Sequence, residues 1–178
     1  MPFRRLISRD RPGWGPEEPE RVRRKLLSRL DPWSYWVAAL PAEGPGDFAV
    51  VGTTGAFLIA VWGLEGPFHV DGDKATVGGE PIGGLKEIRS EARRLKGKLL
   101  DAAVFAEVSP VVCLSRATAG APLTVRGVRI LGLADLISEI TRRDRVLLPN
   151  RAQHGAEALG TVLRSDLVAG PNAEGGEE

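Results

Sequence analysis

The chain has 178 residues, 43% of them apolar, and its 24 basic side chains nearly balance 23 acidic ones. This length predicts one domain with a substantial apolar core, which excludes a disordered or fibrous chain. The only cysteine is Cys113 and the only histidines are His69 and His154. A disulfide framework, a CxxC zinc site and a histidine metal cluster are therefore excluded.

The sequence predicts a soluble cytoplasmic protein with no membrane partner. Arg4 and Arg5 are not followed by the apolar stretch of a signal peptide. The longest apolar stretch, 48–62, is interrupted by Gly-Thr-Thr-Gly and is too short to span a bilayer. The single cysteine fits a reducing compartment.

Charge is distributed unevenly along the chain. Residues 1–30 hold nine basic and four acidic side chains, whereas residues 165–178 hold four acidic side chains and no basic one. We expect a basic flexible arm over 1–16, a folded domain over 17–167 and an acidic disordered tail over 168–178. Solvation of the two ends and a nucleic-acid partner are both open explanations of this asymmetry.

The first half of the domain predicts a helix followed by strands. Residues 20–30 place Val22, Leu26, Leu27 and Leu30 on one helical face, and residues 33–40 are typical of a strand. The segments DFAVVG and GAFLIAVW, joined by Thr53-Thr54, predict a hairpin over 47–62. Both arms are continuously apolar, so we expect this part of the sheet to be covered on both faces.

The middle of the chain predicts a second hairpin and a long helix. Glycine and aspartate at turn spacing over 63–81 predict a short hairpin at the edge of the same sheet, and Asp71-Gly72-Asp73 lacks the later ligands of a calcium loop. Residues 85–100 predict a helix whose apolar stripe is Leu85, Ile88, Ala92, Leu95 and Leu99.

The last third predicts two strands and two helices. The strands are expected over 108–114 and 121–131, and the helices over 133–143 and from 152 to about 167. Cys113 lies in the first of these strands with no histidine or other base near it in the sequence. We therefore expect a buried, unreactive thiol.

The two-residue loop predicts the register of the first hairpin. Thr53 and Thr54 as loop residues place Asp47 opposite Ala60, and the alternation of side chains points Trp62 to the same face. An aspartate at this place either begins the strand or contributes to a functional cluster with Ala60 and Trp62. The sequence leaves both interpretations open.

A basic stripe runs beside the apolar stripe of the helix over 85–100. It consists of Lys86, Arg89, Arg93 and Lys96, one position after the apolar residues at the same steps. One interpretation is a solvated flank supported by Glu87 and Glu91. The other is a surface that contacts phosphate groups.

The order of these segments resembles the NERD (nuclease-related) domain, a branch of the PD-(D/E)XK nuclease fold. The resemblance covers about residues 17–165 and rests on five segments, which are ERVRRKLL, GDFAVVGTTGAFLIAVWG, FHVDGDKATVGGEPI, LKEIRSEARRLKGKLL and SPVVCLSR with the LTVRGVRILGLADLISEI that follows. It implies an α/β fold with a central mixed β-sheet flanked by helices, a restriction-endonuclease-like core.

The resemblance also implies where a catalytic site would lie. The family's aspartate falls at Asp47, but its second acid falls at Ala60 and its lysine at Trp62. Glu91 occupies the position of the family's helical glutamine, and Glu20 is the candidate for an early helical acid. Such a site needs two acids on Mg²⁺ and a lysine near the attacking water, and here two of these three parts are missing.

We therefore expect a catalytically degenerate domain with no cofactor that binds nucleic acid or protein, with nucleic acid held by the basic helical stripe and the N-terminal arm. A first alternative is a weak Mg²⁺- or Mn²⁺-dependent nuclease built on Asp47, Glu20 and a displaced acid. A second is a structural subunit that pairs with itself or another protein. In the nuclease alternative, the missing acid could be replaced by Glu43, Glu65 or Glu91 and the missing lysine by Lys74 or Lys86. In the structural alternative, the interface anchors would be Trp14, Trp33 and Trp36.

Overall fold

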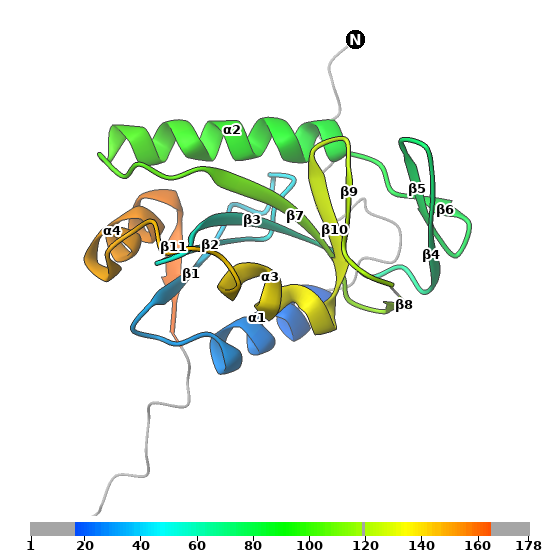
Figure 1. Ribbon diagram of the computed structural model, residues 1–178, viewed down its shortest axis with the longest axis horizontal. Coiled ribbons are helices and arrows are strands. Elements are labelled where there is room, and N and C mark those ends of the chain that lie inside the picture. The colour runs from blue at the N-terminus through cyan, green and yellow to red at the C-terminus, as the bar shows by residue number, and fades with distance from the viewer. Residues whose placement is uncertain (1–16, 119, 165–178) are drawn as a thin grey trace, which may run out of the picture.

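The computed structural model describes residues 17–118 and 120–164. The predicted arm, which includes Trp14, and the whole of the predicted tail lie outside these residues. Its centre is a seven-stranded mixed sheet in the order β11-β1-β2-β3-β7-β10-β9 (Figure 1). The strands are β1 (Tyr35–Ala39), β2 (Phe48–Gly52), β3 (Gly55–Trp62), β7 (Val108–Leu114), β9 (Leu123–Val125), β10 (Val128–Gly132) and β11 (Thr161–Leu163). The α/β class and the mixed sheet are thus confirmed.

The predicted hairpin lies in the middle of this sheet with the predicted register. Gly52 pairs with Gly55 and Phe48 with Ile59, so Thr53-Thr54 form the loop. Every residue of β2 and β3 is buried. The expectation of a hairpin covered on both faces is confirmed.

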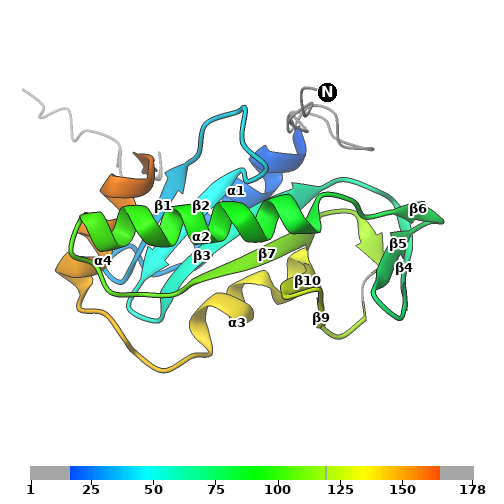
Figure 2. The same ribbon diagram turned by 90° about the horizontal axis from the view of Figure 1, so that it is seen from above.

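Helices cover both faces of the sheet (Figures 1 and 2). On one face lie α2 (Leu85–Asp101) and α4 (Pro149–Leu159), which share an apolar cluster with Leu58 and Val112. On the other face lie α1 (Glu17–Arg29) and α3 (Leu136–Thr141), which pack on Phe57 and Ile59. Because side chains alternate along β3, successive residues of this strand belong to two separate apolar cores, one on each face of the sheet.

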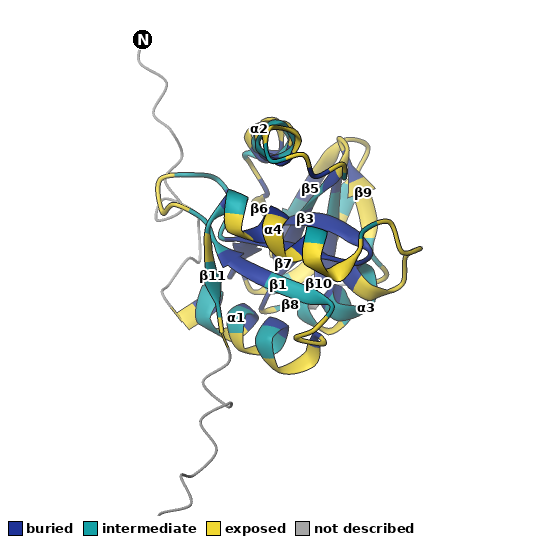
Figure 3. Cartoon of the chain, turned by 90° about the vertical axis from the view of Figure 1, so that its left-hand side faces the viewer, coloured by how far each residue is buried: buried dark blue, intermediate teal, exposed yellow. Residues whose placement is uncertain are grey.

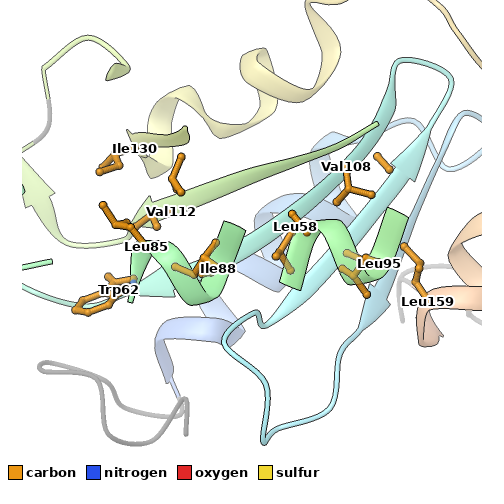
Figure 4. Packing of buried hydrophobic residues seen from close by; sticks show 14 of the residues in the cluster. Leu58, Trp62, Leu85, Ile88, Leu95, Val108, Val112, Ile130 and Leu159 are labelled. Carbon is orange, nitrogen blue, oxygen red and sulfur yellow. The ribbon is translucent and has the colours of Figure 1, made fainter. Parts of the chain in front are cut away.

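Helix α2 follows the predicted apolar stripe. Its buried residues are Leu85, Ile88, Ala92, Leu95 and Leu99, all five predicted from the spacing. Figure 4 shows this stripe lying along β3, with Leu85 beside Trp62 at one end and Leu95 near Val108 toward the other. The amphipathic period thus determined both the length of the helix and the side that packs on the sheet.

The prediction that residues 63–81 lie at the edge of the main sheet was wrong. They form β4 (Gly66–Asp71), β5 (Lys74–Val77) and β6 (Glu80–Pro81), which make a second sheet with β8 (Ala117–Thr118). Gly66 turns the chain away from β3, with φ +116° and Gly78 so close that a Cβ would approach it to 2.8 Å. The hairpin then buries Ala75 and Val77 in the α2-side core, and its tip at Gly72 is a turn.

The end of the domain also differs from the expectation. Residues 121–131 form a hairpin of two strands, and 133–143 contain a short 3-10 helix, η2 (Leu133–Asp135), before α3. The last helix does not reach residue 167, because it ends at Leu159 and the chain continues as β11 beside β1. Gly160 allows this passage, since a Cβ there would lie 2.3 Å from the Ala39 carbonyl oxygen. Among the described residues, no helix combines the length and the apolar character needed to cross a bilayer.

Candidate functional site

Asp47 lies at the start of β2, where the ladder to β3 ends. Its carboxylate Oδ2 accepts a hydrogen bond of 2.7 Å from the backbone N–H of Val61, and its own N–H donates to the Ile59 carbonyl at 2.8 Å. The Asp47 carboxylate thus accepts the hydrogen bond that a backbone carbonyl would accept if β2 continued further along β3. This contact supports the interpretation of Asp47 as the residue that begins the strand.

Ala60 and Trp62 both belong to the buried cluster beneath α2. Ala60 is fully buried, and Trp62 is 5% exposed and lies beside Leu85 (Figure 4). The indole Nε1 of Trp62 is buried and has no hydrogen-bond partner among the described residues. The positions of the family's second acid and lysine are therefore filled by apolar packing.

The two remaining acidic candidates lie on opposite sides of the sheet. Glu20 is on α1 and forms ion pairs with Arg23 at 3.2 Å and Arg24 at 3.5 Å. Glu91 is on α2, bonded to Arg94, and lies near Gly44 in the loop that leads to Asp47. Because the sheet separates α1 from α2 (Figure 1), these two carboxylates do not converge.

A catalytic Mg²⁺ does not fit this arrangement. Binding would need converging oxygen ligands, whereas Asp47 bonds the backbone, Ala60 has no side-chain oxygen, and no group of three potential ligands occurs among the described residues. The displaced candidates do not change this. Glu43 is exposed, Glu65 pairs with Arg116 at 3.1 Å, and Lys74 lies on the second sheet.

The sequence interpretation missed a polar cluster where β3 and β7 end. Glu18 of α1 is 2% exposed, accepts a hydrogen bond from the Ser115 hydroxyl and forms an ion pair with Arg116. The Ser115 N–H donates to the Trp62 carbonyl at 3.0 Å, so the cluster joins the two strand ends to α1. Glu18 precedes Val22 and Leu26 at four-residue steps, so the same apolar stripe would have revealed it. Glu20 lies off that stripe.

Two of the four basic side chains of the α2 stripe bond to other described residues. Lys86 and Arg93 are exposed, whereas Arg89 donates to the Arg126 carbonyl at 3.0 Å and Lys96 forms an ion pair with Glu107. Glu91 is paired with Arg94, which raises the pKa of that guanidinium. Lys86 and Arg93 are thus exposed to solvent, whereas Arg89 and Lys96 also bond to neighbouring segments.

The side chain of Cys113 lies on the face of the sheet away from α2, in the core beneath α1. Burial raises the pKa of its thiol to about 12, and Asp47 adds to the rise while Lys25 opposes it. Because a raised pKa keeps the thiol neutral at pH 8, we expect the folded protein to be unreactive toward Ellman's reagent and the unfolded protein to react with one equivalent. Rapid reaction of the native protein would contradict a rigid core at this position.

Comparisons with known proteins provide no relative for this chain. No family model, no curated protein and no solved structure matches it.

Proposed function

We propose that the chain is a catalytically degenerate, NERD-like domain of the PD-(D/E)XK fold that binds nucleic acid through the outer face of α2. The observation that carries the non-catalytic part is the packing of the hairpin. Ala60 and Trp62 lie inside the core, and the Asp47 carboxylate bonds the Val61 amide between them. At the positions that the resemblance assigns to the second acid and the lysine, the described residues therefore offer no side-chain metal ligand and no cation to activate a phosphodiester.

The binding part rests on the charge and rigidity of α2. The helix carries six basic and three acidic residues, and its buried stripe holds it firmly against β3 and β7. Lys86 and Arg93 are both exposed and lie two turns apart, about 10 Å along the helix, so each can contact a different phosphate. Arg89 and Lys96 extend the same stripe.

We expect the double variant Lys86→Ala/Arg93→Ala to bind nucleic acid more weakly and with less salt dependence. Loss of two phosphate contacts should lower the slope of log K against log [salt] by about 1.4 to 1.8, because each contact releases a condensed counterion. The measurement is fluorescence anisotropy of labelled single- and double-stranded DNA and RNA across a salt series.

The matched control is Arg24→Ala/Lys74→Ala, which removes the same charge from exposed positions outside α2. Equal weakening in both double variants would show a general charge effect and refute the assignment to α2. Cleavage of the same labelled strands that needs Mg²⁺ or Mn²⁺ and disappears in Asp47→Ala would overturn the non-catalytic part. In that case the weak-nuclease alternative would be correct.

A further inference from the structure

A second surface lies at the opposite end of the sheet, around the β2–β3 turn. Four of the six large apolar side chains that are exposed among the described residues belong to it: Trp33 (81%), Phe105 (75%), Leu148 (67%) and Val146 (60%). We call these four the turn-end patch. Figure 3 looks onto this end of the molecule, where exposed loops surround α4.

Hydrogen bonds join the segments of the turn-end patch, and two of these segments meet at one loop residue, Thr53. The Thr53 N–H donates to the Ser34 carbonyl at 3.0 Å, and the Thr53 carbonyl accepts from Val146 and Leu147 at 2.7 and 3.1 Å. The Arg151 guanidinium bonds the Ala103 carbonyl, which ties the start of α4 to the segment that carries Phe105. Residues distant in sequence thus form one end surface.

The exposed tryptophan is held in a fixed turn. The Asp31 carboxylate accepts bonds from the Ser34 hydroxyl at 2.7 Å and the Trp33 N–H at 3.1 Å, and these bonds lower the pKa of Asp31. The turn therefore keeps its bonds above the ordinary pKa of an aspartate and loses them only as the pH falls through the lowered value. Because the backbone of this turn is already ordered, it loses little entropy when a partner covers Trp33.

The basic side chains around the turn-end patch are all arginines, and they outnumber the acids. Segments 29–34, 103–107 and 142–151 contain five arginines, no lysine and three acids. Arg142 and Arg145 are exposed and form no ion pair with a described residue. Of the three acids, Asp31 caps its turn, Glu107 pairs with Lys96, and Asp144 is exposed between the two arginines, which leaves this stretch with a net positive charge. Arginine and tryptophan are enriched, and lysine is depleted, at the centres of protein–protein interfaces.

We propose that the turn-end patch docks an acidic segment of a separate protein, whose apolar side chains cover Trp33 and Leu148 and whose carboxylates pair with Arg142 and Arg145. Charge complementarity selects an acidic partner. The mixture of aliphatic and aromatic side chains favours a protein, whose apolar side chains can cover all four, whereas bases would stack only on Trp33 and Phe105 and leave Val146 and Leu148 uncovered. The surface shares no residue with the outer face of α2, so this proposal and the proposed function can fail independently.

The test is selection of peptides by the full-length protein. A phage-displayed library of random 16-residue peptides is panned on the wild type, and the most enriched peptide is synthesised with a fluorescent label. We expect enriched peptides to combine aspartate or glutamate with large apolar residues. The labelled peptide should bind at least tenfold more weakly to Trp33→Ser and to Arg142→Glu/Arg145→Glu, and unchanged to Lys86→Ala/Arg93→Ala and to Leu123→Ser, which removes an exposed leucine from β9.

Several results would overturn the proposal. The first is that panning enriches no peptides that combine acidic and large apolar residues. The second is that the labelled peptide binds the patch variants as tightly as the wild type. Two further outcomes would assign the turn-end patch to another occupant. One is a concentration-dependent dimer in sedimentation that Trp33→Ser disperses, and the other is cosedimentation with phosphatidylserine vesicles that the same variant abolishes. Thermal denaturation of each variant confirms that these exposed substitutions leave the fold intact.

Discussion

Trp62→Lys is expected to lower the free energy of unfolding by about 3–5 kcal/mol, the range for truncating a large buried aromatic side chain. Trp62 is 5% exposed and packs beside Leu85 at the first turn of α2. The substitution removes that apolar contact and places an ammonium group in the apolar cluster beneath the helix. Urea denaturation followed by circular dichroism measures the change.

The matched control is Trp62→Phe. Because the indole Nε1 has no hydrogen-bond partner among the described residues, phenylalanine removes no bond and keeps much of the apolar contact. We expect a loss below about 1.5 kcal/mol. Wild-type stability of Trp62→Lys would mean that the lysine finds an acidic partner, and would reopen the case for a catalytic site at this strand end.

Glu18→Ala is the second substitution with a large expected effect, a loss of about 2–3 kcal/mol in the free energy of unfolding. It leaves the buried Ser115 hydroxyl without its carboxylate acceptor and removes the ion pair to Arg116. The cost stays below that of breaking a fully buried ion pair, because Arg116 is one-third exposed and also bonds Glu65. Urea denaturation at several salt concentrations is the measurement.

Glu20→Ala provides the control on the same helix. Its side chain is 40% exposed and, among the described residues, pairs only with neighbouring arginines of α1, so we expect a change of at most about 1 kcal/mol that shrinks with salt. If both variants lost the same stability, the Glu18 cluster would contribute no more than a surface ion pair. Glu18→Gln, which keeps a side-chain oxygen for Ser115, should lie between the two.

The register of the hairpin over 47–62 was predicted from local sequence, but tertiary contacts stabilise its turn. A Thr-Thr loop is not a favoured hairpin turn, yet the register it predicted is the one observed. The reason lies in tertiary contacts, because the Thr54 hydroxyl donates to the Ile140 carbonyl at 2.6 Å and Thr53 bonds Ser34 and Val146. Both threonines are buried by these segments.

In the candidate site too, the sequence predicted some features, whereas others depended on tertiary contacts. The sequence placed Asp47, Ala60 and Trp62 at one strand end, since period and register depend only on neighbours along two paired strands. It did not reveal that Asp47 bonds the Val61 amide, because that bond depends on where the strand ladder stops. It selected Glu20 as the early helical acid, although Glu18 is the acid of α1 that reaches Ser115 and Arg116.

The amphipathic stripe of α2, the buried hairpin and the strand over 108–114 were determined by the sequence itself, because each follows from a period that one segment carries alone. Tertiary structure decided the rest. The second sheet needed β8 as a partner, and β11 needed the free edge of β1. The turn-end patch needed the segments of Ser34 and Val146 to meet at Thr53, and the segment of Phe105 to be bonded to α4 through Arg151. Such contacts depend on which surfaces the packed elements leave uncovered, and no single segment carries that information.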